Sequence, residues 1–198
     1  MFEKGLLAKK RILVTGGGSG LGAAMGRRFV ELGAELIICG RRLELLEATA
    51  AQMRSEFGGK VSVVRCDIRD GGAVEAMMDA LWREAPLDVL VNNAAATFIA
   101  QTEHLSFRAA DAILAPTLHG AMYCTLGAGK RWIDGAHKGV VLSILSTSTI
   151  TGRAFTVRVP SRNALMKSVE LLSPTEYLPS SITARDAPML QALSATAE

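Results

Sequence analysis

A chain of 198 residues is long enough for one domain with a substantial core and too short for two comfortable domains. The net charge is +3, from 22 basic and 19 acidic residues spread along the chain, and no basic stripe is interleaved with aromatic residues. These features argue against a nucleic-acid partner. The 49% hydrophobic content, with few aromatic residues, indicates an α/β interior built from small aliphatic side chains.

The positions of the cysteines and histidines predict free thiols in the core and no metal site. Cys39, Cys66 and Cys124 are odd in number and far apart in the sequence, and two of them fall in predicted strands, so we expect core thiols of a cytoplasmic protein. The three histidines form no metal-ligand pattern with these cysteines. No stretch approaches the roughly 18 apolar residues that cross a bilayer, so no membrane partner is expected.

Residues 14–22, with the sequence Val-Thr-Gly-Gly-Gly-Ser-Gly-Leu-Gly, predict a phosphate-binding turn. They follow the apolar run 12–14, which indicates a buried strand, and they open a segment with apolar residues at helical spacing. A glycine-rich turn between strand and helix lets a phosphate approach the backbone, and free N–H groups and the helix dipole then face the anion. A merely flexible turn is the alternative interpretation.

Strands and helices then alternate along the chain. Strands are predicted at residues 35–39, 61–66, 87–91 and 139–146, and helices at 43–57 and 72–85. Residues 104–133 are predicted to be mostly helical, with interruptions at Pro116, Gly127 and Gly129. The alternation predicts an α/β fold, a doubly wound parallel sheet of about five strands with helices on both faces. We expect one domain over residues 1–172, and an irregular or disordered tail over 173–198, which is rich in Ser, Thr, Ala and Pro.

Two arginines, Arg41 and Arg42, follow the predicted strand 35–39, and no acidic residue occurs there before Glu44. In dinucleotide-binding folds an acidic residue near this strand end binds the ribose hydroxyls, whereas an arginine binds a 2′-phosphate through a bidentate contact. The pair therefore favours NADP(H) over NAD(H) as the cofactor. The alternative is that both arginines belong to a solvated helix start.

Two motifs together resemble the short-chain dehydrogenase/reductase family, which has a Rossmann-type fold. The spacing Gly-x-x-x-Gly-x-Gly is preceded by Thr15, and the tetrapeptide 92–95, Asn-Asn-Ala-Ala, follows strand 87–91, where that family carries Asn-Asn-Ala-Gly. The resemblance implies a set of cofactor-binding residues, ordered by the part of the cofactor. They are Gly16, Ser19, Gly20, Leu21 and Gly22 for the pyrophosphate, Arg41 for the 2′-phosphate, Asp67 and Ile68 for the adenine, and Asn93, Ala94 and Ala95 beside the ribose.

The residues around Asp67 also allow other roles. Asp67 could equally serve as the N-cap of the helix predicted at 72–85. Arg69 follows at the same edge of the predicted sheet, where it could meet an anionic substrate or form an exposed salt bridge. The sequence leaves these alternatives open.

A later stretch resembles one branch of the family, the 2,4-dienoyl-CoA reductases. Residues 147–152 and Val159-Pro160-Ser161 look most like that branch, in which Val-Pro-Ser precedes a helix with the catalytic lysine. The branch implies a reductase that passes hydride between NADPH and a small-molecule substrate, an unsaturated acyl thioester such as an acyl-CoA or a related carbonyl.

The catalytic residues of the family, which form the reaction end of the site, are not matched in this sequence. The family needs a Tyr and a Lys four residues later on one helix face, and a Ser that polarises the carbonyl. No Tyr-x-x-x-Lys occurs in this sequence, whose tyrosines are Tyr123 and Tyr177. The dienoyl-CoA branch places its catalytic Tyr at the position of Ser148 in this chain, and its catalytic Lys at the position of Leu165. The best remaining polar groups are Ser146, Ser148, Ser161 and Lys167. The alternative function is therefore a catalytically inactive nucleotide-binding remnant.

Two further departures concern the helix beside the active site and the C-terminal part. The family's helix carries an Asn where this chain has Thr117, or His119 in the dienoyl-CoA branch. The pattern vanishes beyond about Val169, before the family's sixth strand and substrate lid, so we expect an incomplete C-terminal part. A truncation or a shifted reading frame after Pro160 would produce it.

The family also implies self-association, because its long fourth and fifth helices pair across a dimer. Unpaired, these helices would expose apolar side chains in this chain, which predicts a homo-oligomer. The side chains concerned are Leu114, Leu118, Met122 and Leu126.

Overall fold

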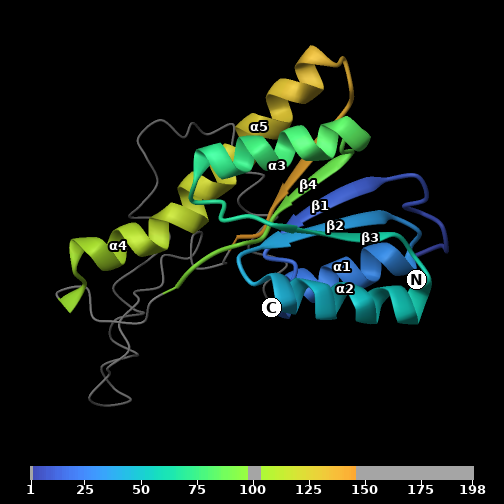
Figure 1. The fold of residues 1–198 in the computed structure, drawn as a ribbon, viewed down its shortest axis with the longest axis horizontal. Coiled ribbons are helices and arrows are strands. Elements are labelled where there is room, and N and C mark those ends of the chain that lie inside the picture. Colours follow the sequence, from blue (N-terminus) through green and yellow to red (C-terminus); the bar gives the residue numbers. More distant parts are fainter. Residues whose placement is uncertain (1, 98–103, 146–198) are drawn as a thin grey trace, which may run out of the picture. The chain divides into compact units, whose positions relative to one another are not determined.

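The computed structural model describes residues 2–97 and 104–145, in which strands and helices alternate (Figure 1). The strands are β1 (Arg11–Thr15), β2 (Glu35–Gly40), β3 (Val61–Arg65), β4 (Val89–Asn92) and β5 (Val140–Ser143). The α-helices are α1 (Gly20–Glu31), α2 (Leu43–Phe57), α3 (Gly71–Glu84), α4 (Phe107–Leu114) and α5 (Ala121–Asp134). A π-helix, η2 (Ala115–Gly120), joins α4 to α5.

All five strands form one parallel sheet in the order β3-β2-β1-β4-β5. Leu13 of β1 is in register with Ile37 of β2 on one side and with Leu90 of β4 on the other. The chain therefore moves outward from β1 to β3 and then crosses back to β4, which reverses the strand order between β1 and β4. The predicted doubly wound parallel sheet is confirmed, and this reversal is the point where such sheets bind ligands.

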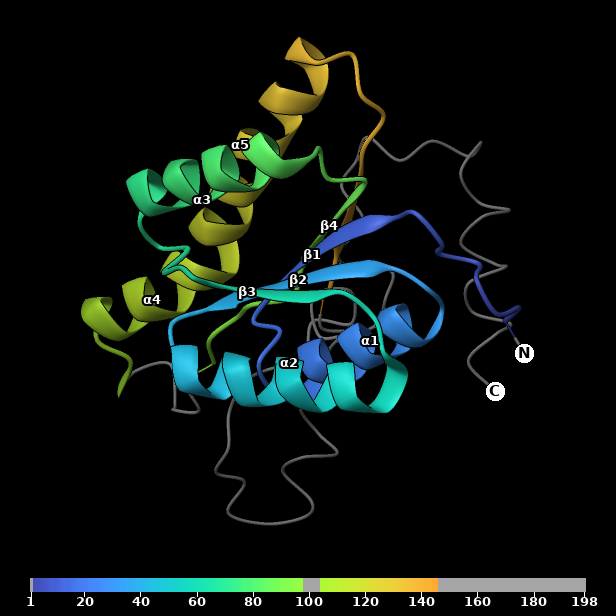
Figure 2. The ribbon, with the colours of Figure 1, turned by 45° about the vertical axis from the view of Figure 1, so that its right-hand side comes forward.

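Helices cover both faces of the sheet (Figure 2). Alternate residues of a strand point to opposite faces. In β1, Ile12 and Val14 pack with α1 and α2 in one buried cluster, whereas Leu13 packs with α3 and α5 in the other. The second cluster also contains the three cysteines, which are free and buried as predicted.

The long helical segment before β5 differs from its prediction at the two glycines. The predicted break at Pro116 is confirmed as the π-helix η2, whose first turn contains the proline, a residue with no N–H to donate. The predicted breaks at Gly127 and Gly129 are wrong, because α5 runs through both. Gly127 is buried where α5 packs on α3: a Cβ there would lie 3.2 Å from Met78 Cγ. Close helix packing, rather than chain flexibility, accounts for this glycine.

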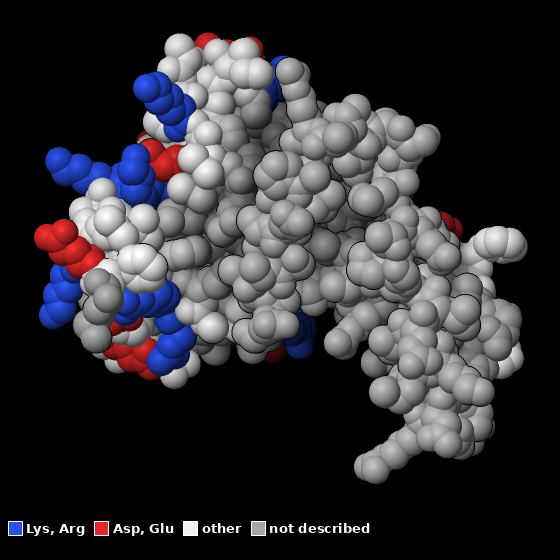
Figure 3. Space-filling model, turned by 180° about the vertical axis from the view of Figure 1, so that it is seen from behind, with Lys and Arg blue, Asp and Glu red and all other residues white. Residues whose placement is uncertain are grey.

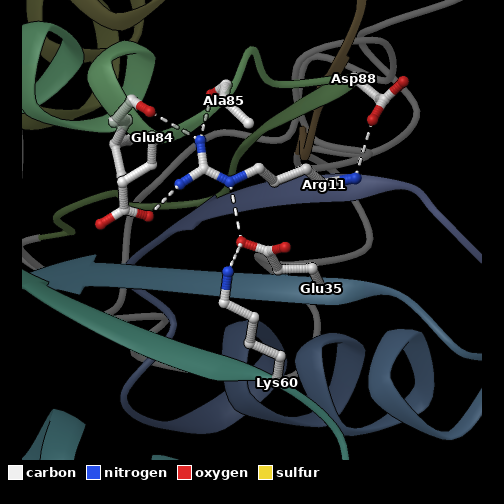
Figure 4. A network of polar contacts seen from close by, with 7 residues as sticks. Arg11, Glu35, Lys60, Glu84, Ala85 and Asp88 are labelled. Carbon is white, nitrogen blue, oxygen red and sulfur yellow. Dashed lines mark hydrogen bonds and ion pairs between the residues drawn. The ribbon is translucent and has the colours of Figure 1, made fainter.

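A buried arginine ties the amino ends of the strands together (Figure 4). Arg11 of β1 is only 4% exposed, and its guanidinium donates to Glu35 at 2.9 Å and to Glu84 at 2.7 Å. It also donates to the carbonyl oxygens of Leu81 and Ala85, and Lys60 pairs with Glu35 at 2.9 Å. A buried charge is tolerated only when it is fully paired in this way.

The surface carries interspersed charges, and no described helix is long and apolar enough to cross a membrane. On the face drawn in Figure 3, lysine and arginine side chains lie beside aspartate and glutamate side chains in the described part of the chain. This mixture is what the nearly balanced composition predicts.

Candidate functional site

The glycine-rich turn between β1 and α1 is closely packed at Gly16 and Gly22. Gly16 has a φ of 69°, and a Cβ there would lie 3.1 Å from Ala94 Cα. A Cβ at Gly22 would overlap the Gly16 carbonyl oxygen and lie 2.6 Å from Asn93 Nδ2. The first turn of α1 contains no acidic residue, and its N-cap, Ser19, makes no side-chain capping bond. Backbone N–H groups and the Ser19 hydroxyl are thus left for an anion at this helix start.

Thr15 connects this turn to the end of β4 through hydrogen bonds. Its hydroxyl accepts hydrogen bonds from the backbone N–H groups of Asn93 and Ala94, both at 3.0 Å, and donates to the Val91 carbonyl at 3.3 Å. The Asn93 side-chain amide donates to the Thr15 carbonyl at 2.9 Å. The glycine-rich turn and residues 93–94 therefore form one rigid unit at the carboxyl ends of β1 and β4.

Asn92 links β4 to α5. Its Nδ2 donates to Thr125 Oγ1 at 2.9 Å, and that hydroxyl donates to the Ala121 carbonyl at 2.8 Å. The two asparagines of the tetrapeptide thus brace different elements, since Asn93 contacts the turn and Asn92 contacts the helix.

A cleft of about 380 Å³ opens at the carboxyl ends of the strands, above the point where the strand order reverses. All of the predicted cofactor-binding residues line it except Gly20, which begins α1 with a φ of 54°. The predicted residues in the lining are Gly16, Ser19, Leu21, Gly22, Arg41, Asp67, Ile68, Asn93, Ala94 and Ala95. The structure therefore brings together residues from the ends of β1, β2, β3 and β4.

The arginine pair lies at a solvated helix start, as one of the two interpretations predicts, and this helix start borders the cleft. Arg41 and Arg42 are exposed and line the cleft, and Arg42 is also the N-cap of α2, without a side-chain capping bond. The positive end of the α2 dipole and two guanidinium groups consequently meet at one edge of the cleft. Glu44, in the first turn of α2, does not line it.

Asp67 faces the cleft and does not cap a helix. The N-cap of α3 is Asp70, whose carboxylate accepts from the backbone N–H groups of Gly72 at 2.8 Å and Ala73 at 3.2 Å, so the N-cap interpretation of Asp67 is wrong. Asp67 instead accepts from the Arg69 guanidinium at 2.6 to 3.1 Å, which confirms the predicted salt bridge. These hydrogen bonds lower the pKa of Asp67, and the positive charge of Arg41 contributes further.

Two buried thiols also reach the cleft, but neither is a nucleophile. Cys39 and Cys66 line it, and burial raises the pKa of Cys66 to about 11 and that of Cys39 well above its usual range. A thiol of this kind stays protonated at neutral pH, and the thiolate is the reactive species. The cysteines are therefore part of the wall and the core.

The π-helix η2 closes another side of the cleft. Pro116 of η2 and Ala112 of α4 line it, and Thr117 bonds to the loop after β4, accepting from the Ala96 N–H at 3.1 Å and donating to its carbonyl oxygen at 3.4 Å. Thr117 thus holds this loop against the helix. His119 lies against Tyr123, with ring centroids 6.4 Å apart, and does not line the cleft.

A family model and several relatives match this chain. The model of the short chain dehydrogenase family matches residues 10–158. The chain belongs to the short-chain dehydrogenase family. A curated relative from Bacillus subtilis (strain 168), named "Probable 2,4-dienoyl-CoA reductase", is 35% identical over 142 residues, which are 71% of this chain and 56% of the relative. The predicted membership, with its resemblance to the dienoyl-CoA reductase branch, is thereby confirmed.

Solved structures of short-chain dehydrogenases share the fold of this one. The citronellol catabolism dehydrogenase AtuB of Pseudomonas aeruginosa PAO1 gives a TM-score of 0.69 at 30% sequence identity, over 74% of this chain and 59% of that one. A metagenomic short-chain oxidoreductase in complex with NADP gives a TM-score of 0.65 at 26% identity, over 71% of this chain and 62% of that one. The present chain spans about half the length of the curated relatives it matches.

A second cavity of about 350 Å³ lies beside the first in this short-chain dehydrogenase. It shares Ala94 and Ala95 with the cleft, and its wall is formed largely by apolar side chains of η2, α5 and the end of β5. Asn92 also lines it, and its buried Oδ1 accepts no hydrogen bond from the described residues. The apolar lining residues include Leu118, Met122, Leu126, Ile144 and Leu145.

The predicted reaction-end residues of this short-chain dehydrogenase, Ser146, Ser148, Ser161 and Lys167, lie outside the described residues. Among those described, Tyr123 does not line the cleft, and no group of His, Cys, Asp and Glu could hold a metal. The cleft also contains residues that the sequence did not indicate. Ala112 and Pro116 come from a distant helical segment and carry no motif.

Proposed function

We propose that this short-chain dehydrogenase binds NADP(H) in the cleft and uses it to reduce an unsaturated acyl thioester. The observation that carries the proposal is the convergence of the glycine-rich turn, the Arg41 edge and the Asn93 loop on one cleft at the strand-order reversal. Clefts at such a reversal of strand order bind nucleotides because helix N-termini and small residues meet there.

The order of the strands supports one direction for the cofactor. The ends of β2 and β3 lie on one side of the glycine-rich turn and the end of β4 lies on the other. In the proposal Asp67 and Ile68 border the adenine, the turn with Gly16 and Gly22 binds the pyrophosphate, and the loop at Asn93 borders the second ribose. The closely packed glycines fit this role, because a side chain at Gly22 would collide with its neighbours.

The preference for NADP(H) rests on charge. Arg41 and Arg42 present two guanidinium groups at the start of α2, and this edge of the cleft has no acidic side chain before Glu44. A 2′-phosphate gains charge-assisted hydrogen bonds there, whereas ribose hydroxyls would lack the usual carboxylate partner. The relative solved with NADP supports the same cofactor class.

The reaction would use the cofactor as a two-electron carrier. The bound nicotinamide supplies the hydride, and this chain's residues hold and orient the cofactor. Relatives named as 2,4-dienoyl-CoA reductases support an unsaturated acyl thioester as the substrate class. Ser146, Ser148, Ser161 and Lys167 are the proposed polar groups of the reaction end.

A second candidate function is nucleotide binding without catalysis. It is favoured by one observation, the lack of a Tyr-x-x-x-Lys in the sequence, whose tyrosines are Tyr123 and Tyr177. Tyr123 does not lie in the cleft. Both candidates require cofactor binding, and they differ only in turnover.

The two candidates are separated by one titration followed by one assay. We expect the purified protein to bind NADPH more tightly than NADH in a fluorescence titration. Arg41→Ala should lower the ratio of the NADH Kd to the NADPH Kd by roughly tenfold. Adding a dienoyl thioester to the NADPH complex then tests turnover. Oxidation of NADPH would establish the reductase, binding without oxidation would establish the inactive remnant, and absence of binding would reject both.

We also infer that the protein self-associates. Leu118, Met122 and Leu126 are 49%, 50% and 63% exposed on η2 and α5, on the helical segment that also lines the apolar second cavity. A contiguous apolar surface of this kind favours pairing with a second copy of the same chain.

A further inference from the structure

We propose that Thr49 of α2 is a positioning residue for the cofactor pyrophosphate, because its hydroxyl fixes the direction of one peptide group in the glycine-rich turn. The inference rests on the proposed cofactor site, but it concerns a residue that lies outside the cleft. Thr49 does not line the cleft, whereas Gly18 and Ser19, the two residues joined by that peptide group, do.

The Thr49 side chain is hydrogen-bonded to the glycine-rich turn. Its Oγ1 donates to the Gly18 carbonyl oxygen at 2.9 Å, across 31 residues of sequence. Gly18 is buried and Thr49 is half-buried, so water competes little for this bond. Gly18 is also the third of three consecutive glycines, the residue type with the widest backbone freedom. The bond from Thr49 therefore selects one direction for a carbonyl group that its own chain leaves free to turn.

The direction of this carbonyl also sets the direction of the next N–H group. No cis peptide bond occurs in the described part of the chain, and in a planar trans peptide the C=O and N–H groups point in opposite directions. With the Gly18 carbonyl held toward Thr49, the Ser19 N–H points away from Thr49, and no backbone carbonyl of the described residues accepts from it. In the reversed orientation, a carbonyl oxygen would stand where an anion needs N–H groups.

The face of α2 that carries Thr49 also reaches the arginine edge of the cleft. Arg42, Leu45, Leu46 and Thr49 recur at helical spacing and so share one face. A Cβ on Gly18 would lie 3.1 Å from Leu46 Cδ2 and 3.6 Å from Leu45 Cγ, so this face packs on the turn. Arg42, the N-cap of α2, lines the cleft two helical turns before Thr49. One helix thus supports both edges at which the proposed cofactor presents phosphate.

The test measures the affinities of four ligands for the wild type and for Thr49→Val, which removes the hydroxyl with little change in volume. NADPH, NADH and ADP contain a pyrophosphate, whereas adenosine 2′-phosphate does not. The fluorescence of bound NADPH and NADH gives their affinities, and displacement of NADPH gives those of the other two ligands. We expect the Kd of the three pyrophosphate ligands to rise by roughly three- to tenfold, and that of adenosine 2′-phosphate to stay unchanged.

Two further variants serve as controls. Thr49→Ser keeps the hydroxyl and should bind ADP with nearly the affinity of the wild type. Ser55→Val makes the same exchange of a hydroxyl for a valine at an exposed position of the same helix, and should bind all four ligands as the wild type does. Melting temperatures of all variants confirm that folded proteins are being compared.

Equal losses of ADP and adenosine 2′-phosphate affinity in Thr49→Val would show that the whole cleft has loosened. Unchanged ADP affinity in Thr49→Val would show that the bond does not orient the turn, and a Thr49→Ser variant as weak as Thr49→Val would show that the hydroxyl is not the acting group. Each of these results overturns the inference and leaves the proposed function intact. A wild type that binds neither NADPH nor NADH would reject the proposed function itself.

Discussion

Thr15 and Asn93 are 78 residues apart in the sequence and are joined by two hydrogen bonds in the structure: the Asn93 N–H donates to Thr15 Oγ1 at 3.0 Å, and Asn93 Nδ2 donates to the Thr15 carbonyl at 2.9 Å. Thr15 is 1% exposed, so these bonds are shielded from water. They align the glycine-rich turn with the loop after β4. The position of the glycine-rich turn against the loop after β4 therefore depends on Thr15 and Asn93.

Replacing Thr15 by Val removes the hydroxyl with little change in volume. The N–H groups of Asn93 and Ala94 lose their acceptor, and we expect the free energy of unfolding to fall by roughly 1–3 kcal/mol. Urea denaturation measures this change. Ser55→Ala, at an exposed position of α2, is the control and should change stability by less than about 0.5 kcal/mol. Equal stability of the two variants would show that the Thr15 bonds contribute nothing.

Arg11 should matter for stability and not for the cofactor. Arg11→Ala leaves the carbonyl oxygens of Leu81 and Ala85 without their donor and removes one partner from Glu35, which keeps Lys60, and we expect a loss of roughly 1–3 kcal/mol in urea denaturation. Cofactor affinity of the remaining folded protein should stay unchanged, because the network lies at the opposite ends of the strands from the cleft. Arg28→Ala breaks an exposed pair within α1 and an exposed contact with the Phe2 ring, and should cost less than about 1 kcal/mol. A comparable loss in both variants would contradict the special role of the buried network.

The thiols predict a loss of stability at high pH. Burial raises the pKa of Cys66 to about 11 and that of Cys124 to about 12, whereas an unfolded cysteine titrates near 8.5. Below about pH 8 both states keep these protons, so stability is independent of them. Above that, the unfolded state releases protons that the folded state retains, and the free energy of unfolding should fall with rising pH.

Urea denaturation between pH 7 and pH 10 measures this fall, and Cys124→Ala should make it shallower. A thiol reagent at pH 8 gives an independent readout: the native protein should react slowly, and the unfolded protein should react at all three of its cysteines. Rapid labelling of native protein would show that the thiols are accessible.

Self-association should depend on the apolar surface of η2 and α5. We expect the wild type to sediment as an oligomer at micromolar concentration, and Leu126→Asp to shift it to the monomer, because a charge at the centre of an apolar contact is not solvated. Leu6→Asp, at another exposed leucine, should leave the sedimentation coefficient unchanged. A wild type that remains monomeric would reject the inference.

The sequence predicted the parts of the structure that depend on local pattern. The bounds of α2 agree with the prediction because Leu46, Ala50 and Met53 recur at helical spacing and Gly58 ends the helix in the left-handed conformation. Asp67 was not predictable in this way, because whether it or Asp70 caps α3 depends on where the helix begins. The Arg11 network was not predictable either, since its partner Glu84 is 73 residues away.

In the site, too, the parts that carry a sequence motif could be predicted, and the parts that depend on tertiary packing could not. The glycine spacing and the tetrapeptide 92–95 identified the parts of the cleft that carry a motif, and the structure brings them together. The π-helix η2 and the Thr117 contact to Ala96 depend on how a helix packs against a loop some twenty residues earlier. The salt bridge of Asp67 and Arg69 was one of the alternatives that the sequence left open, and the geometry was needed to choose it.

The affinity of NADPH for the wild type and for Gly22→Ala is the most direct test of the account. The added Cβ would overlap the Gly16 carbonyl oxygen and lie 2.6 Å from Asn93 Nδ2, which distorts the turn that is proposed to bind the pyrophosphate. The account predicts that the wild type binds NADPH, that Gly22→Ala weakens binding by about tenfold or more, and that Gly129→Ala, where the added Cβ has no neighbour within 4 Å, binds as the wild type does. A wild type that does not bind NADPH, or a Gly22→Ala variant with unchanged affinity, would contradict it.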